Sequence, residues 1–214
     1  MNKICVSTFY TEDIKDLYDL ISLSYKKYCD KNNYDFVSRN ISYEIYDRHP
    51  VWYKIYYIQE LLNKYEWVLF VDCDTLLTND NIKIENFIKD EKDLYISKDI
   101  NGINAGVMLI KNSEWSKIFL DHCWNIDKND PIYHEPGFSW NITQAEQRAI
   151  IVMIKKFGLD KVEFLPQNIF NAYIYNTWNL QYPQGEWNKN SFILHAPGCS
   201  LKQRLEMFKN KLNE

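Results

Sequence analysis

The chain has 214 residues and a mass of 25.8 kDa, which fits one domain at roughly 100–200 residues per domain. Hydrophobic residues make up 46% and charged residues 25%, which is ordinary globular usage and excludes a disordered chain. The net charge of -4 lacks the basic surplus typical of nucleic-acid binders, so no nucleic-acid partner is expected. The aromatic fraction of 16% is unusual and favours either ring stacking on a ligand or extra core area.

The predicted strands and helices alternate along the chain. The predicted strands are Lys3–Thr8, Asp35–Ser38, Trp67–Val71, Leu94–Ser97, Gly106–Ile110, Val162–Leu165 and Phe192–Leu194. Apolar residues at helical spacing predict helices over residues 11–31, 51–62 and about 144–157. This order predicts an α/β fold in one domain spanning residues 1–214, with a Rossmann-like, mainly parallel central sheet flanked by helices. Ligands bind beyond the carboxyl ends of the strands in such sheets.

Cysteine usage and apolar runs indicate the compartment. The five cysteines include no Cys-x-x-Cys pair, which favours free thiols and a reducing environment. No apolar run approaches the ~20 residues that span a bilayer, and the first ten residues are too short and polar for a signal peptide. We therefore expect a cytoplasmic protein, with peripheral attachment to a membrane left open.

Two carboxylates follow a continuous apolar strand, at Asp72 and Asp74. Residues two apart in extended chain face the same way, so these anions repel unless a cation compensates them. A hard divalent cation with a nucleotide diphosphate fits this pattern, and so does a plain polar turn. An aspartyl phosphohydrolase with Asp72 as nucleophile is a further alternative. Its Asp-x-Asp-x-Thr pattern is not matched, because Thr75 comes one position early.

Several further segments resemble glycosyltransferases of the GT-A type, nearest to family 34, which includes galactosyl-, mannosyl- and xylosyltransferases. The matching segments are Trp52–Lys54, Asp72–Asp74, Gly102–Ser116, Glu146–Ala149, Pro166–Asn171 and His195–Cys199. The Asp-x-Asp pair alone is weak, whereas the ordered set is fairly specific. The chain is shorter than eukaryotic family members, and we expect it to lack their membrane anchor.

The resemblance implies a metal site for Mn²⁺ or Mg²⁺. Asp74 is implied as a direct ligand, Asp72 as a ligand that also lies near the ribose, and His195 as a third ligand through a ring nitrogen. A buried core histidine is the alternative for His195, and its place after a strand and before Gly198 favours the ligand.

The resemblance also implies which residues bind the nucleotide sugar. They are Thr8, Phe9, Tyr10, Lys54, Asp72, Asn104, Ala105, Gly106, Gly198 and Lys202. Tyr10 would stack on uracil or pack as another buried aromatic. Lys54 and Lys202 each either serve the site or face solvent, Lys202 by neutralising the departing diphosphate. Asn104–Gly106 would lie beside the donor sugar, or mark a tight turn into the strand Val107–Ile110.

Glu146 and Gln147 are the candidate catalytic residues. Glu146 has a structural alternative, since Thr143-x-x-Glu146 is also a helix capping box. Gln147 is implied to lie near the anomeric carbon, where its carbonyl would stabilise developing positive charge. His134, Glu135 and Trp140 are candidates for acceptor contact or for a solvated loop.

The resulting hypothesis is retaining transfer of a hexose, deoxyhexose or pentose from a UDP-sugar to a hydroxyl acceptor such as a glycan. No carboxylate stands out as an obligatory nucleophile, which favours same-face attack assisted by Gln147. A phosphohydrolase and a non-catalytic nucleotide-sugar-binding module are the alternatives. The sequence does not identify the sugar, the acceptor or the oligomeric state.

Overall fold

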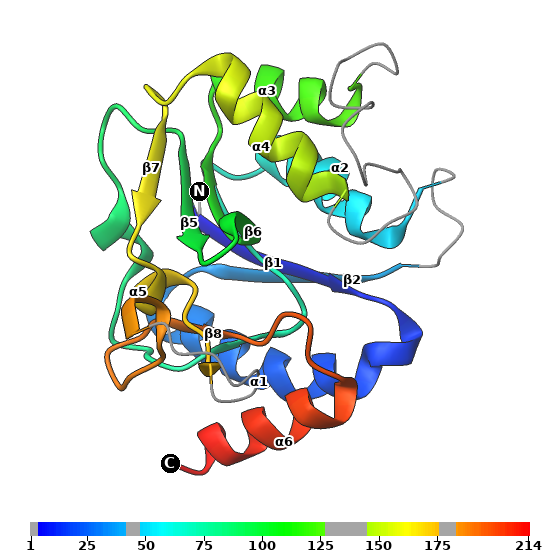
Figure 1. Cartoon of the computed structure of the whole chain (residues 1–214), viewed down its shortest axis with the longest axis vertical. Helices are drawn as coiled ribbons and strands as arrows, with labels where there is room; N and C mark the ends of the chain where they lie inside the picture. The colour runs from blue at the N-terminus through cyan, green and yellow to red at the C-terminus, as the bar shows by residue number, and fades with distance from the viewer. Residues whose placement is uncertain (1–3, 42–47, 127–144, 176–182) are drawn as a thin grey trace.

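A computed structural model describes residues 4–41, 48–126, 145–175 and 183–214. Six strands form a central sheet in the order β2-β1-β3-β6-β5-β7 (Figure 1). Their bounds are β1 Ile4–Tyr10, β2 Asp35–Asn40, β3 Trp67–Val71, β5 Leu94–Asp99, β6 Gly102–Lys111 and β7 Val162–Leu165. Only β6 runs antiparallel to its neighbours β3 and β5, and the other pairings are parallel. The prediction of an α/β fold with a mainly parallel sheet is confirmed.

Strand β3 shows why this sequence forms the centre of the sheet. All five of its residues are buried. Val68 and Phe70 belong to one hydrophobic cluster, whereas Trp67, Leu69 and Val71 belong to the other. Because successive side chains of a strand point to opposite faces, a fully apolar strand has a core on both sides.

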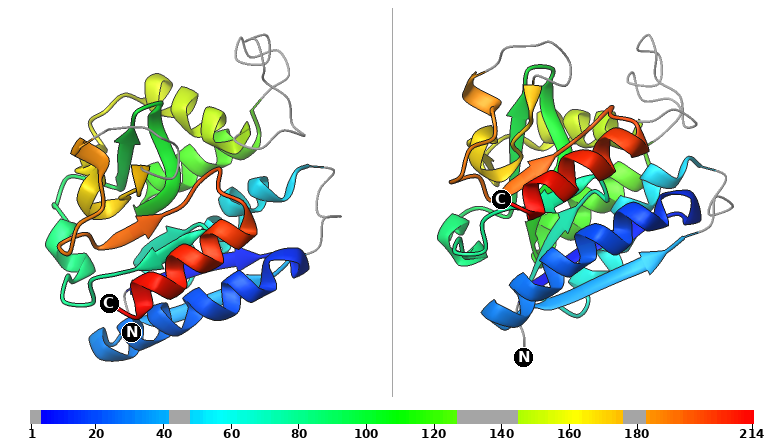
Figure 2. Two further views of the ribbon diagram at one scale, coloured as in Figure 1. Left: turned by 60° about the horizontal axis from the view of Figure 1, so that its bottom comes forward. Right: turned by 90° about the horizontal axis from the view of Figure 1, so that it is seen from below.

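Helices cover both faces of the sheet (Figures 1 and 2). One face carries α2 (Tyr53–Leu62), α3 (Glu114–Trp124) and α4 (Ala145–Phe157). The other face carries α1 (Lys15–Asn32) and α6 (Leu201–Leu212), which lie side by side. Shorter elements complete the described chain: η1 Glu12–Ile14, η2 Pro50–Trp52, η3 Ile84–Phe87, α5 Gln167–Phe170 and η6 Pro183–Gly185.

A second, two-stranded antiparallel sheet pairs β4 (Thr75–Leu77) with β8 (Ile193–His195). The strand predicted over Phe192–Leu194 thus exists one residue later, and it lies outside the central sheet. His195 is its last residue and pairs with Thr75. The small sheet therefore carries the C-terminal part of the chain back to the end of β3.

The structure excludes one of the two interpretations of Asn104–Gly106, namely that these residues form a tight turn. Strand β6 begins at Gly102, so these three residues lie inside the strand and the tight-turn interpretation is wrong. The reversal lies just before, and Gly102 follows it with a φ of 113°, in the region that favours glycine. Sequence reasoning placed the start of the strand too late because Ile103–Gly106 does not form an apolar run.

Two further sequence expectations concern thiols and membranes. All five cysteines are free thiols, and all are buried. Among the helices in the described residues, none combines the length and apolar character needed to cross a membrane.

Candidate active site

A pocket of about 620 Å³ opens where β1 and β3 end. Its described lining residues are Phe9, Ile14, Val51, Phe70, Asp72, Cys73, Asp74, Asp99, Ile100, Asn101, Asn104, Gly106, Glu146, Gln147, Tyr173, Tyr175, His195, Pro197, Gly198 and Arg204. These come from segments far apart in sequence, and they meet at the edge where parallel α/β sheets bind ligands. The pocket therefore contains both implied catalytic residues and all three implied metal ligands.

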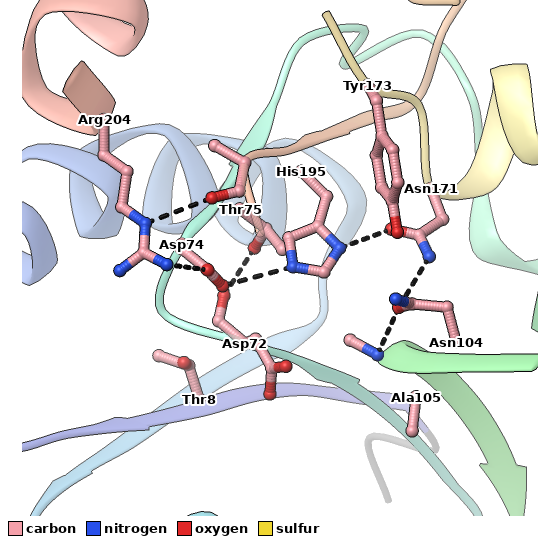
Figure 3. A network of polar contacts seen from close by, with 12 residues as sticks. Thr8, Asp72, Asp74, Thr75, Asn104, Ala105, Asn171, Tyr173, His195 and Arg204 are labelled. Atoms are coloured by element: carbon pink, nitrogen blue, oxygen red, sulfur yellow. Dashed lines mark hydrogen bonds and ion pairs between the residues drawn. The ribbon is translucent and has the colours of Figure 1, made fainter. Parts of the chain in front are cut away.

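Asp72, Asp74 and His195 form one cluster in this pocket (Figure 3). One potential ligand atom from each lies within 4.8 Å of the others. The small sheet explains this proximity, because Thr75 pairs with His195 and the Ala196 amide donates to the Asp74 carbonyl at 2.9 Å. His195 is 2% exposed, so it is buried and also faces the acidic pair.

Arg204 of α6 is the second cation beside Asp74. Its Nη2 lies 2.6 Å from Asp74 Oδ2, while His195 Nε2 lies 3.2 Å from Asp74 Oδ1. Burial alone would raise the pKa of Asp74, but His195 and Arg204 outweigh it and hold the pKa below its ordinary value. Asp74 is therefore kept as a carboxylate.

Lys54 is buried beneath the acidic pair, at 2% exposure, so the solvent-facing interpretation of this lysine is wrong. Its Nζ lies 2.9 Å from Asp72 Oδ1, 2.9 Å from the Ala105 carbonyl and 3.3 Å from Glu146 Oε1. Burial would lower the pKa of Lys54, but Asp72 and Glu146 outweigh it and raise the pKa. A charged Lys54 thus compensates two carboxylates at once, the buried Glu146 and the partly exposed Asp72.

Glu146 is 4% exposed, and its second oxygen, Oε2, has no hydrogen-bond partner among the described residues. Burial raises the pKa of this carboxyl although Lys54 lowers it. The capping-box alternative needs Thr143, which lies outside the described residues. Gln147, the next residue of α4, accepts the Ala105 amide at 2.9 Å through Oε1. Both side chains thus reach from α4 to the edge of β6.

Sequence reasoning missed three residues that line the pocket, Arg204, Asp99 and Tyr173, and did not single out Asn171, which contacts His195 from behind. Asn171 Oδ1 lies 2.8 Å from His195 Nδ1, and Tyr173 donates its hydroxyl proton to Asp99 Oδ2 at 2.8 Å. The sequence contains a pattern that could have indicated Arg204. Leu201, Arg204 and Phe208 have the spacing of one helix face, so Arg204 is expected on the side of α6 that packs against the protein. The others are brought in by chain pairing that no local pattern shows.

Of the other residues that the resemblance implies, some line the pocket and some do not. Phe9 and Gly198 line the pocket, and Gly198 has a φ of 70°. Thr8 is buried and drawn below Asp72 in Figure 3, but it is not among the described lining residues. The Tyr10 ring stacks on Tyr18 with centroids 3.8 Å apart. Lys202 is exposed at the start of α6. His134, Glu135 and Trp140 lie outside the described residues.

The donor set fits a divalent cation. The carboxylates of Asp72 and Asp74 are oxygen donors of the kind that Mg²⁺ and Mn²⁺ prefer, and the imidazole nitrogen of His195 favours the transition metal. Around them, the three carboxylates of Asp72, Asp74 and Glu146 face two permanent cations, Lys54 and Arg204. This leaves one negative charge without a compensating cation. Burial and the neighbouring Asp74 carboxylate raise the pKa of Asp72, although Lys54 lowers it. A bound divalent cation would relieve that repulsion.

The fold is that of the GT-A glycosyltransferases. It matches a glycosyltransferase involved in the glycosylation of the major capsid of PBCV-1 with a TM-score of 0.76, at 16% identity over 97% of this chain and 99% of that chain. It also matches the galactosyltransferase LgtC, solved with donor and acceptor sugar analogs, with a TM-score of 0.57, at 13% identity over 96% and 95% of the two chains.

The sequence model of the galactosyl transferase GMA12/MNN10 family matches residues 86–206, more than half of the chain, and the chain belongs to this family. The matched range contains Glu146, Gln147 and His195 and begins after the acidic pair. A second model, described as a protein of unknown function (DUF273), matches residues 25–137.

Individual relatives are distant and longer. The probable alpha-1,2-galactosyltransferase gmh2 of Schizosaccharomyces pombe is 26% identical over 84% of this chain and 60% of its own length. The probable alpha-1,6-mannosyltransferase MNN10 of Saccharomyces cerevisiae is 24% identical over 57% of this chain and 38% of its own length. The chain thus spans 60% or less of the length of these two relatives.

Proposed function

We propose that the chain transfers a hexosyl or pentosyl unit from a UDP-sugar to a hydroxyl group of a glycan or other acceptor, with Mn²⁺ or Mg²⁺ and with retention at the anomeric carbon. The observation that carries the proposal is the convergence of Asp72, Asp74 and His195 with Glu146 and Gln147 in one pocket. Membership of a galactosyl transferase family supports it, and galactosyltransferases among the relatives favour a UDP-linked donor.

On the nucleotide side, Asp72, Asp74 and His195 would hold the cation. When bound, the cation stabilises the negative charge of the departing diphosphate. Arg204 is placed to add a positive charge from α6, and Lys202 is a further candidate at the start of the same helix. Phe9 lines the pocket at the end of β1, where the base would bind.

On the sugar side, Glu146 lines the pocket, and its buried Oε2 has no hydrogen-bond partner among the described residues. A buried carboxylate oxygen without a partner is costly, so a sugar hydroxyl that donates to it would be bound with specificity. Gln147 Oε1 keeps one lone pair beyond its bond to the Ala105 amide. That lone pair is available to stabilise the positive charge that develops at the anomeric carbon.

The way the pocket carboxylates are engaged supports our proposal of retention by same-face attack. Asp72 and Glu146 share Lys54, Asp74 binds Arg204, and Asp99 accepts from Asn104 and Tyr173. Asp72, Asp74 and Asp99 are thus engaged by these partners, and we assign the unpartnered Oε2 of Glu146 to a sugar hydroxyl, so the proposal includes no covalent intermediate. The relatives' names also specify alpha linkages, which an alpha-linked nucleotide sugar gives when configuration is kept.

The first experiment measures thermal unfolding with UDP and a panel of UDP-sugars, with and without Mn²⁺. A ligand at 100 times its dissociation constant should stabilise the protein by about 2.7 kcal/mol. We expect stabilisation by UDP that requires Mn²⁺. The best donor is then tested for transfer, and the anomeric configuration of the new glycosidic bond is read by proton NMR.

Asp74→Asn is the companion variant, because it removes the carboxylate that holds both His195 and Arg204. We expect it to abolish Mn²⁺-dependent UDP binding and turnover. The matched control is Asp121→Asn on the exposed face of α3, which should change neither. Binding of UDP and Mn²⁺ without transfer or donor hydrolysis would indicate the non-catalytic module. Phosphate release from an aryl phosphate without nucleotide binding would indicate the phosphohydrolase.

A further inference from the structure

A row of side-chain hydrogen bonds runs from β6 to the back of the His195 ring (Figure 3). The Gly106 amide donates to Asn104 Oδ1 at 2.9 Å, and Asn171 Nδ2 donates to the same oxygen at 3.0 Å. Asn171 Oδ1 then lies 2.8 Å from His195 Nδ1. His195 and Asn171 are almost completely buried, so these groups have no alternative partners in water.

The backbone fixes the direction of every bond in this row. A backbone amide can only donate, so the Asn104 atom that faces Gly106 must be the oxygen. Asn104 Nδ2 then donates to the Asp99 carboxylate at 3.1 Å, which confirms its orientation. The Asn171 atom that faces Asn104 Oδ1 must be the nitrogen, so its oxygen faces His195. Nδ1 of His195 must therefore carry a proton.

The opposite side of the ring faces the acidic pair. With the proton on Nδ1, a metal binds the ring through Nε2, which is the atom 3.2 Å from Asp74 Oδ1. The ring is also confined by Gly106, since a Cβ on that residue would lie 2.2 Å from His195 Cε1. Tyr173 stands edge-on to the ring at 5.5 Å.

We propose that Asn171 and Asn104 are positioning residues that hold His195 with its proton on Nδ1 and its Nε2 toward Asp72 and Asp74, ready to bind a divalent cation. The inference rests on the metal dependence in the proposed function. The same Gly106 that starts the row accepts the Asp72 amide at 2.8 Å through its carbonyl. One residue of β6 thus ties the orientation of the histidine to the position of the first aspartate.

The test is the Mn²⁺ dissociation constant of the purified protein, measured from the electron paramagnetic resonance signal of free Mn²⁺. Asn171→Leu keeps the shape of the side chain and removes both polar atoms. Loss of such a partner behind a metal-binding histidine typically weakens metal affinity about 10–100-fold, and we expect this range. The control is Asn168→Leu, in the short helix α5 that Asn171 directly follows, which should leave the affinity unchanged.

A double-mutant cycle separates positioning from a general structural effect. If Asn171 acts through His195, Asn171→Leu should change Mn²⁺ affinity by less than about twofold in a His195→Ala background. An equal loss in both backgrounds would overturn the proposal. Asn171→Asp keeps an acceptor for the Nδ1 proton, so it should bind Mn²⁺ much better than Asn171→Leu, and equal losses would again count against positioning.

A measurement on the unmodified protein keeps the test valid if the variants fail to fold. With Mg²⁺ and UDP bound, nitrogen-15 correlations of the His195 ring should show the proton on Nδ1, and a proton on Nε2 would refute the inference. The two proposals fail differently. A wild-type protein that binds no divalent cation would end the metal model and this inference together. Wild-type binding that is insensitive to Asn171→Leu would end only the inference.

Discussion

Gly106 is the residue at which the backbone meets the candidate site. Its amide and carbonyl contact Asn104 and Asp72, and its missing side chain leaves room for the His195 ring. Gly106→Ala should therefore displace the ring and weaken Mn²⁺ binding at least tenfold, with a loss of about 1–3 kcal/mol of folding free energy from overpacking. Calorimetric Mn²⁺ titration and urea unfolding measure the two effects.

The double variant Gly106→Ala/His195→Ala is the control for this steric explanation. Removing the ring opens the space that the new methyl group needs. The substitution at Gly106 should then cost little folding free energy in the His195→Ala background. An undiminished cost there would mean that the glycine is required for another reason.

Arg204 and Lys202 offer a matched pair of cations on α6. Arg204 reaches Asp74, whereas Lys202 is exposed. Arg204→Ala should weaken Mn²⁺-dependent UDP binding by about tenfold or more, the scale of a charge-assisted hydrogen bond. Lys202→Ala should have a smaller effect. Isothermal titration with UDP at fixed Mn²⁺ compares them, and an equal or larger loss for Lys202→Ala would assign the diphosphate contact to Lys202.

The sequence predicted the site unevenly, for a physical reason. Asp72 and Asp74 were found because a buried strand and two adjacent acids are a local pattern. Lys54 could be interpreted in two ways, since a helix lysine shows its partner only when another element packs against it. Asn171 was not singled out, because its contact with His195 depends on the β4–β8 pairing. Strands of three residues leave almost no periodicity to detect.

At the scale of elements, Lys54 joins α2 to three other parts of the fold. It contacts Asp72 after β3, the Ala105 carbonyl in β6 and Glu146 in α4. Lys54→Met should destabilise the protein by about 3–5 kcal/mol, because it leaves the buried Glu146 carboxylate and the partly exposed Asp72 carboxylate without their common cation. Urea unfolding measures the change.

Two variants check that explanation. Lys64→Met replaces an exposed lysine just after α2 and should be nearly neutral. Glu146→Gln in the Lys54→Met background removes one of the stranded charges and should recover part of the loss. If it recovers nothing, the cost of Lys54→Met comes from packing and not from charge.

The arrangement of elements was predicted less well than their existence. Six of the seven predicted strands lie in the central sheet, but the antiparallel direction of β6 was not expected. A fully apolar strand looks the same in sequence whichever way it runs, because both of its faces are buried. Helix α4 was predicted almost to the residue from its apolar spacing.

At the scale of the whole molecule, the two hydrophobic clusters lie on opposite faces of one sheet. Adjacent residues of β1 and β3 alternate between the two clusters. Unfolding of these strands would therefore disrupt both clusters at once. The site takes its residues from the ends of these same strands and from α4, β8 and α6. We therefore propose that residues 1–214 unfold as one cooperative domain.

Far-ultraviolet circular dichroism and tryptophan fluorescence should then give coincident urea transitions. Trp52 reports on one cluster and Trp67 on the other. Adding Mn²⁺ and UDP at about 100 times the dissociation constant should move both transitions together, by roughly 2.7 kcal/mol at unchanged slope. Because the candidate site lies at one edge of the sheet, a bound ligand affects both cores only if the sheet couples them. A shift in one signal alone would mean that the cores unfold separately.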